Sequence, residues 1–134
     1  MYTGTCLCKA VSVEIRGAIS QIIHCHCSLC RKNSGTAFAT NGFVNTHEFT
    51  LTKGEDNLTE FNFKPGRARF FCKTCGSPIY SANAEDKSRL RIRLGLIDDD
   101  ITEQVISHNF VTSKANWEQL ETHLPCYEKH EPGR

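Results

Sequence analysis

The chain has 134 residues, and its 16 Lys and Arg side chains almost balance 15 Asp and Glu, for a formal net charge of +1. That balance argues against a sequence-independent nucleic-acid binder, which carries a basic excess. No apolar run of about eighteen residues could span a membrane. We therefore expect one domain over residues 2–127 with a polar tail at 128–134, and neither nucleic acid nor a membrane as a partner. The oligomeric state is not encoded in any pattern we recognise.

Patterns along the chain predict many short strands separated by turns. Val11, Val13 and Ile15 alternate with polar residues, as in a half-buried strand, and similar runs recur to residue 111. A helical turn is expected at 28–33 and a short helix at 113–120, with Ser113 as its N-cap. The expected strands cover residues 11–15, 19–24, 36–44, 49–52, 58–63, 67–71, 78–83, 90–94 and 105–111. The fold class is therefore all-β, with irregular zinc-stapled sheets of short antiparallel strands and little helix.

The chain has eight cysteines, and their spacing needs a separate explanation. The N-terminus lacks the basic start and apolar run of a signal peptide, so we expect a cytoplasmic protein whose thiols stay reduced. Metal ligation is then favoured over a disulfide framework. Seven cysteines form three groups, and Cys126 stands alone. The groups are Cys6-x-Cys8, Cys25-x-Cys27-x-x-Cys30 and Cys72-x-x-Cys75.

The first and last groups together supply four sulfurs in two spaced pairs. Cys72 and Cys75 are followed by Gly76, which is the form of a zinc knuckle, in which glycine lets the backbone turn beneath the metal. We interpret Cys6, Cys8, Cys72 and Cys75 as one closed structural site, whose binding energy contributes to folding. Such a site would join two parts of the chain that are far apart in the sequence.

Cys25, Cys27 and Cys30 remain as a group of three sulfurs within six residues. One interpretation is a second closed site completed by His24, His26 or Cys126. The other is an open site with one position left for an exogenous ligand. Zinc with three thiolates is electron-rich, so it is better suited to binding another soft sulfur than to making hydroxide. A thiol bound there loses its proton and becomes a nucleophile.

Nucleobase deaminases are the competing class of cysteine-rich zinc enzymes. Their signature requires Pro-Cys-x-x-Cys. Phe71, not proline, precedes Cys72, and the Pro125-Cys126 pair has no later cysteine. The sequence therefore excludes the deaminase signature.

Several stretches together resemble the glutathione-dependent formaldehyde-activating enzyme family, which includes the centromere protein V type. They are Gly4-Thr-Cys-Leu-Cys8, residues 24–35, Phe71-Cys-Lys-Thr-Cys-Gly-Ser-Pro78 and the terminal stretch from Ser107 to Trp117, and the likeness extends over roughly residues 2–127. Lys9 stands where the family usually has glycine after Cys-x-Cys, and Gly95-Leu96-Ile97-Asp98 replaces the commoner Gly-(Ser/Thr)-Leu-Asp.

The resemblance implies a mostly β fold with two Zn²⁺ ions per chain. It implies that Cys6, Cys8, Cys72 and Cys75 hold the structural ion, and that Cys25, Cys27 and Cys30 hold the catalytic one. The implied enzyme is a carbon–sulfur lyase of the S-hydroxymethylglutathione synthase type, which takes a small thiol such as glutathione and a small aldehyde such as formaldehyde.

Several residues near the clusters are weaker candidates for a functional role. Glutathione has two carboxylates, so Arg31, Lys32, Arg67 and Arg69 are candidate substrate contacts, although exposed basic residues usually only meet solvent. His24 and His26 could orient a thiolate or move a proton near neutral pH, or could be structural. Within the terminal motif, His108 accompanies Trp117, which is expected to pack in the core or a lid. The alternative function is a non-enzymatic zinc-binding module for protein partners.

Overall fold

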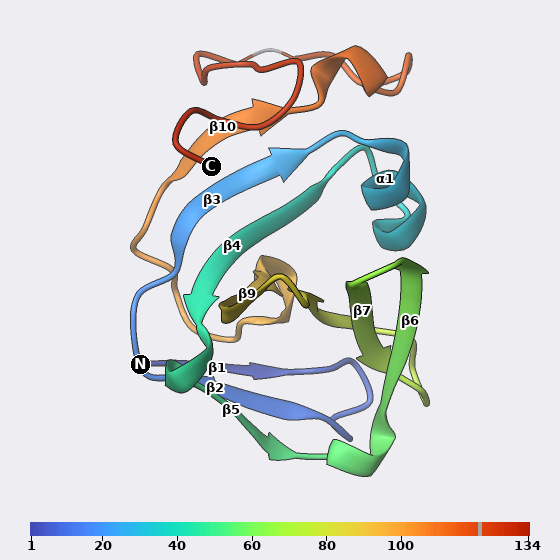
Figure 1. Ribbon diagram of the computed structural model, residues 1–134, viewed down its shortest axis with the longest axis vertical. Coiled ribbons are helices and arrows are strands. Elements are labelled where there is room, and N and C mark those ends of the chain that lie inside the picture. The colour runs from blue at the N-terminus through green and yellow to red at the C-terminus, as the bar shows by residue number, and fades with distance from the viewer. Residues whose placement is uncertain (121) are drawn as a thin grey trace.

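The computed structural model describes residues 1–120 and 122–134, and it folds them into two β-sheets and one short α-helix (Figure 1). The helix α1 is Ser28–Ser34, and single 3-10 turns are η1 Thr46–Glu48, η2 Glu55–Asn57, η3 Leu94–Leu96 and η4 Val111–Ser113. The strands are β1 Tyr2–Thr5, β2 Ser12–Ile15, β3 Ser20–Cys25, β4 Ala39–Asn45, β5 Phe49–Lys53, β6 Leu58–Lys64, β7 Arg67–Cys72, β8 Pro78–Asn83, β9 Asp86–Arg93 and β10 Val105–Asn109.

The strands form a small sheet in the order β1-β2-β5 and a larger one in the order β10-β3-β4-β9-β8-β7-β6. Every pairing is antiparallel except that of β3 with β10, which is parallel. Register shifts interrupt several of these pairings, and such bulges bend and twist a strand. The larger sheet curves around the smaller one in Figure 1 as a result.

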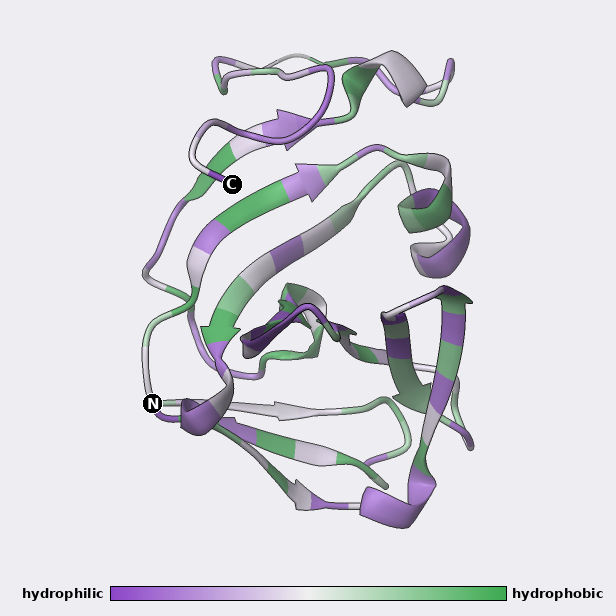
Figure 2. Ribbon diagram, viewed as in Figure 1, coloured by the Kyte–Doolittle hydropathy of each residue, from purple (hydrophilic) through white to green (hydrophobic). Residues whose placement is uncertain are grey.

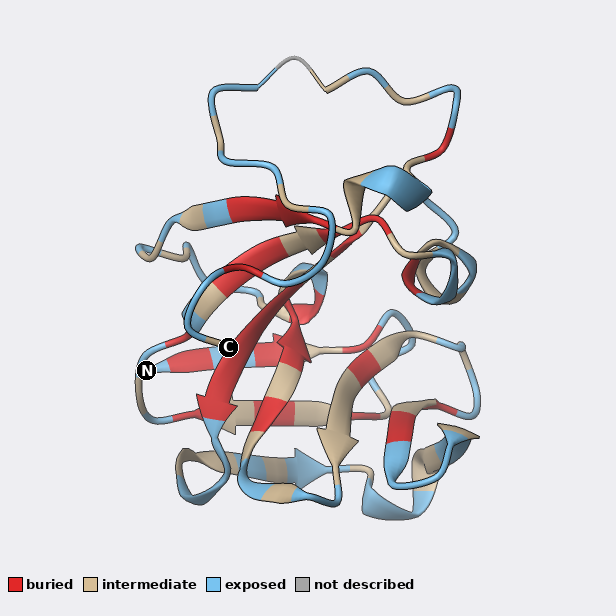
Figure 3. Cartoon of the chain, turned by 45° about the horizontal axis from the view of Figure 1, so that its top comes forward, coloured by how far each residue is buried: buried red, intermediate tan, exposed pale blue. Residues whose placement is uncertain are grey.

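The main core lies between the two sheets. Val13 and Ile15 of β2 are buried, while Ser12 and Glu14 beside them are half-buried, which is the alternation expected of a strand with one apolar face. Ile79 of β8 and Ile92 of β9 join the same core from the larger sheet. Hydrophobic and polar colours alternate along the strands in Figure 2, and the buried segments converge between the sheets in Figure 3.

The nine expected strands match β2 to β10 to within a few residues, and the all-β fold class is confirmed, whereas β1 was not expected. The parallel β3–β10 pair is the one departure from antiparallel pairing. The helix expected at 113–120 is wrong, because only the 3-10 turn η4 forms there and the chain then continues without regular structure. The apolar residues of that stretch have no helical face to bury, and Trp117 is 66% exposed, so its expected core role is also wrong. Position 121 lies outside the described residues.

A polar chain end such as 128–134 commonly frays, but here the segment is held in place. Residues 125–129 run beside β10 through backbone hydrogen bonds, for example from Phe110 N to Lys129 O at 3.2 Å. Further on, the Glu131 side chain is buried and accepts a 3.0 Å hydrogen bond from Asn109 Nδ2. The tail is therefore anchored to the edge of the larger sheet. No helix in the described part of the chain has the length and apolar character needed to cross a bilayer.

Candidate metal centres

Cys6, Cys8, Cys72 and Cys75, which we call the quartet, come together although two come from one turn and two from another. Cys6 and Cys8 follow β1, and Cys72 ends β7 immediately before the turn that carries Cys75. Their four sulfurs all lie within 4.8 Å of one another. A set of four thiolates at this separation can hold a metal ion, and soft sulfur ligands suit zinc.

Short hydrogen bonds fix the quartet sulfurs in place. Cys6 Sγ accepts from Val11 N at 3.3 Å, Cys72 Sγ accepts from Asn57 Nδ2 at 2.9 Å, and Cys75 Sγ lies 3.1 Å from Ser77 Oγ. The Ser77 hydroxyl lowers the pKa of Cys75 to about 5. These donors are neutral groups, so a bound ion would supply the positive charge of the site.

Both turns of the quartet need a left-handed residue. Gly76 has φ 77°, and its N–H donates to Cys72 O at 2.8 Å, which closes the knuckle. The corresponding position after Cys8 is Lys9, which adopts φ 68° and donates its N–H to Cys6 O at 3.0 Å. The turn geometry is therefore kept at Lys9 despite the missing glycine, at a cost of roughly 1–2 kcal/mol for an L-residue with a side chain.

The other cluster, Cys25, Cys27 and Cys30, which we call the trio, forms where β3 passes into α1. Cys25 ends β3 between Ala39 of β4 and Asn109 of β10. Cys27 is the N-cap of α1, and its sulfur accepts from Cys30 N at 3.3 Å. The cap brings the sulfurs of a Cys-x-x-Cys segment onto one side of the first helical turn, so the local sequence is enough to build the cluster.

The three trio sulfurs lie within 4.8 Å of one another, and no histidine or carboxylate of the described residues joins them. His24 Nδ1 instead bonds Thr40 Oγ1 at 2.8 Å, and His26 Nε2 bonds His108 Nδ1 at 2.8 Å. Cys126 is exposed and donates to Leu124 O at 3.6 Å. Among residues 1–120 and 122–134, none of the three candidates for a fourth ligand therefore joins the trio sulfurs.

The electrostatics of the trio favour a cation. Hydrogen bonds from Cys25 and Cys30 lower the pKa of Cys27 to about 2, while the bond with Cys27 raises the pKa of Cys25. A metal that takes all three sulfurs must displace the protons that the thiols still hold. Arg69 adds a positive group, because its Nη2 lies 3.7 Å from Cys30 Sγ and its Nη1 donates to Leu29 O at 3.0 Å.

The trio faces a cavity of about 250 Å³, which we call the trio cavity. Its walls include Arg67, Arg69, Arg91 and Arg93. Arg93 is buried and donates from Nη1 to Asn41 Oδ1 at 2.7 Å. A cavity with this lining favours an anionic ligand, because the guanidinium groups outnumber the acidic ones along its walls.

Two of the four basic residues that the sequence suggested as substrate contacts belong to the cationic lining. Arg67 and Arg69 line the trio cavity, whereas Arg31 and Lys32 do not. Arg91 and Arg93 were missed; their alternation with Leu90 and Ile92 along β9 is the signal that could have found them, because it places the arginines on the face opposite the core.

The histidines lie to one side of the trio cavity and pack around Phe38. The ring centroid of His24 lies 4.3 Å from that of Phe38 and 4.9 Å from that of His108. Burial lowers the pKa values of His24 and His26 to about 4, and the charge of His108 adds to both shifts. Both rings are therefore neutral at pH 7, and among the described residues their contacts are those of a packed cluster.

The family model described as glutathione-dependent formaldehyde-activating enzyme matches residues 1–113. A protein of Schizosaccharomyces pombe (strain 972 / ATCC 24843) that is named an uncharacterized lyase is 30% identical over 87 residues, which are 65% of this chain. The matched stretch spans 61% of that relative's length.

One solved structure supports the fold. The crystal structure of a Rhodobacter sphaeroides protein has a TM-score of 0.63 and 22% sequence identity. The likeness covers 77% of this chain and 96% of the other.

Proposed function

Because the chain belongs to the glutathione-dependent formaldehyde-activating enzyme family, we propose that it is a zinc-dependent carbon–sulfur lyase that joins a glutathione-like thiol to formaldehyde or another small aldehyde. The family match and the relative named as a lyase support a lyase-type function at the level of the family. The observation that carries the finer proposal is the trio, which offers three sulfurs to a cavity where no fourth ligand of the described residues meets them.

We assign the two clusters different tasks. The quartet would hold a structural Zn²⁺, and Cys25, Cys27 and Cys30 would hold a catalytic one. The donor sets fit this ion, because thiolates are preferred zinc ligands and three of them leave one tetrahedral position for substrate. A zinc ion held by Cys25, Cys27 and Cys30 would supply a site that binds a thiol sulfur and favours its nucleophilic, deprotonated form.

The reaction forms one carbon–sulfur bond, and side chains of the chain stabilise the charge that develops. The thiol sulfur forms a bond to the aldehyde carbon, the carbonyl electron pair moves onto oxygen, and the proton given up by the thiol ends on that oxygen. Nothing is oxidised or reduced, and the reverse direction breaks the same carbon–sulfur bond. Arg69 and Arg93 line the trio cavity, where their N–H groups can stabilise the charge that develops on the aldehyde oxygen.

The test uses zinc-loaded protein with glutathione and formaldehyde. Exchange NMR measures how fast S-hydroxymethylglutathione forms and breaks down above the uncatalysed rate. We expect acceleration by the wild type, loss of acceleration in Cys27→Ala, and wild-type rates in Cys126→Ala, which removes an exposed thiol that belongs to neither cluster.

Two outcomes would contradict the proposal. If the wild type binds two zinc ions but neither binds glutathione nor accelerates the exchange, the alternative of a non-enzymatic zinc module gains support. If Cys27→Ala retains full acceleration, the assignment of the trio as the catalytic site is wrong.

A further inference from the structure

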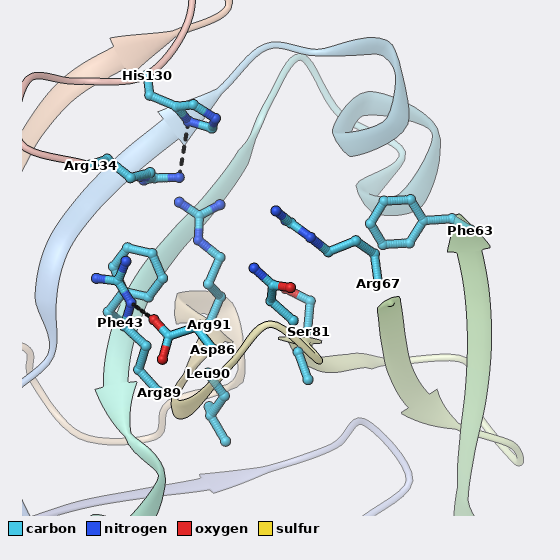
Figure 4. A pocket seen from close by; sticks show the side chains of 12 residues that line it. Phe43, Phe63, Arg67, Ser81, Asp86, Arg89, Leu90, Arg91, His130 and Arg134 are labelled. Carbon is cyan, nitrogen blue, oxygen red and sulfur yellow. Dashed lines mark hydrogen bonds and ion pairs between the residues drawn. The ribbon is translucent and has the colours of Figure 1, made fainter. Parts of the chain in front are cut away.

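A second cavity of about 300 Å³, which we call the arginine chamber, adjoins the trio cavity (Figure 4). Six residues line both spaces, and Arg67, Arg91, His130 and Arg134 are among them. The two cavities therefore meet at a wall made largely of cationic side chains. A ligand that reaches the trio from this direction passes these groups.

Three guanidinium groups surround one aromatic ring in the chamber. The Cζ atoms of Arg89, Arg91 and Arg134 lie 3.8, 4.8 and 4.9 Å from the centroid of the Phe43 ring. A ring face attracts each cation, but three like charges this close also repel one another. Such an arrangement gains stability when an anion enters.

Only two of the three guanidinium groups have an acidic partner among residues 1–120 and 122–134. Arg89 Nε donates to Asp86 Oδ2 and Arg134 Nη2 donates to Glu131 Oε2, both at 2.9 Å. Arg91 has none: its Nε and Nη2 atoms are buried without a hydrogen-bond acceptor. These two atoms form one edge of the guanidinium, and that edge matches the two oxygens of a carboxylate.

Charge and burial around Arg91 agree with this geometry. Burial, with repulsion from Arg134 as the next cause, lowers the pKa of Arg91 to about 10. An unpaired charged group out of contact with water costs free energy that a bound anion would recover.

The C-terminal segment builds one side of the chamber. Arg134 Nη1 lies 3.1 Å from His130 Nδ1, and Figure 4 shows both side chains across the chamber from Arg67. Glu131 fixes the segment, since its buried carboxylate bonds Asn109, the β10 residue that pairs with Cys25. These residues follow position 113, where the match to the family model ends. This side of the chamber therefore lies outside the matched stretch.

We propose that the arginine chamber, through Arg91 and Arg134, binds a carboxylate of the thiol substrate remote from its sulfur, so that the site selects an extended, anionic thiol over a small uncharged one. This inference rests on the proposed function for the position of the sulfur. It adds two specificity residues and a task for the segment at 128–134, which is to complete the anion site.

The test is calorimetric titration of zinc-loaded protein with three probes: glutathione, S-methylglutathione and 2-mercaptoethanol. S-methylglutathione keeps both carboxylates but has no thiol, whereas 2-mercaptoethanol has a thiol and neither a carboxylate nor an ammonium group. Arg91→Gln and Arg134→Gln should each weaken glutathione and S-methylglutathione on the order of tenfold, as expected for a lost hydrogen bond to a charged group. The affinity for 2-mercaptoethanol should stay within about twofold, since this uncharged thiol contacts only the trio.

Lys87→Gln is the matched control, because it removes one positive charge from the same strand at an exposed position that lines neither cavity. It should leave all three affinities unchanged. Melting curves show whether each variant is folded. Arg91→Lys keeps the positive charge but loses the pair of N–H donors on one edge of the guanidinium, so it should recover only part of the glutathione affinity.

The outcomes separate this inference from the proposed function. If Arg91→Gln weakens 2-mercaptoethanol as much as glutathione, or weakens neither, the chamber does not select the carboxylate and the inference is overturned. If the wild type binds glutathione no more tightly than S-methylglutathione, does not bind 2-mercaptoethanol, and loses both peptides in Arg91→Gln, thiol activation fails and the anion site stands.

Discussion

The quartet and the trio use the same side chain in opposite ways. The quartet joins the turn after β1 to the turn between β7 and β8, so Cys8 and Cys72 meet across 64 positions of sequence. The trio lies within six residues at one strand-to-helix junction. Closing a long loop restricts the unfolded chain far more than bridging neighbours does. The sequence separation of the ligands therefore distinguishes a metal centre that can stabilise the fold from one that cannot.

The two clusters also differ in their surroundings, since one lies in the main core and the other beside a cavity. Cys6 and Cys72 of the quartet belong to the main core, and the sulfurs accept from neutral donors such as Asn57. The trio belongs to a small separate core and faces a cavity with arginine in its walls. A centre packed inside the main core contributes stability, whereas a centre beside a cationic cavity can receive a ligand. This difference is why we propose a structural role for the quartet and a chemical role for the trio.

The largest expected effect comes from breaking the quartet with Cys72→Ala. Cys72 is fully buried in the main core, and its loss removes a ligand from a site whose metal would contribute roughly 10 kcal/mol or more to folding. We expect an unfolded or aggregated protein, measured by circular dichroism and by loss of a cooperative melting transition. A normal melting curve would show that the quartet does not hold the fold together. Cys126→Ala is the control, because its exposed thiol lies outside both clusters.

The next largest effect is expected when the trio loses a ligand. Cys27→Ala should lose one of two zinc ions, measured by elemental analysis, and lose thiol-dependent activity while the chain stays folded. Its stability cost is limited to the cap bond from Cys30 N, about 1 kcal/mol, because the trio closes no long loop. A variant that unfolds as completely as Cys72→Ala would erase the proposed distinction between the clusters.

A smaller effect is expected at Arg69, which touches the trio and not the quartet. Arg69→Gln removes the guanidinium near Cys30 Sγ, and such outer partners typically change metal affinity about 10–100-fold. Competition with a chromogenic chelator should show one zinc ion leaving more readily and the other unchanged. Asn57→Ala, which removes the donor to Cys72 Sγ, is the mirror control: it should loosen the other ion. Equal loosening of both ions in either variant would contradict independent sites.

The smallest effect concerns the strained turn of the quartet. Lys9→Gly relieves the left-handed backbone at φ 68° and should stabilise the protein by about 1 kcal/mol, seen as a rise in the melting temperature. The same change should leave glutathione binding at the trio unaltered. A fall in stability would mean that the Lys9 side chain contributes more than its backbone costs.

Local patterns made much of this fold predictable. Alternation in β2 and β9 and the glycine after Cys75 each depend on neighbouring residues, so the strands and the knuckle could be identified from the sequence. The grouping of Cys6 and Cys8 with Cys72 and Cys75 was predictable because spaced pairs of cysteine suggest one site. The gathering of these four sulfurs confirms that grouping, while their metal and its role stay proposals.

The features that sequence reasoning missed depend on long-range packing. Nothing local indicates that β10 lies parallel to β3, or that Glu131 is buried against Asn109. The arginine chamber was missed for the same reason, because Arg91 and Arg134 meet at Phe43 only after the tail folds back. The helix expected at 113–120 does not form, because Ser113 ends the 3-10 turn η4 instead of capping a helix.

X-ray absorption at the zinc edge, with and without glutathione, tests the central claim most directly: one cluster is closed and the other is open. We predict that the zinc of the wild type gains sulfur ligands when glutathione is added, while the zinc of Cys27→Ala, held by the quartet alone, does not change. An unchanged wild-type spectrum, at a glutathione concentration that saturates binding, would show that the trio does not receive the thiol and would contradict the account.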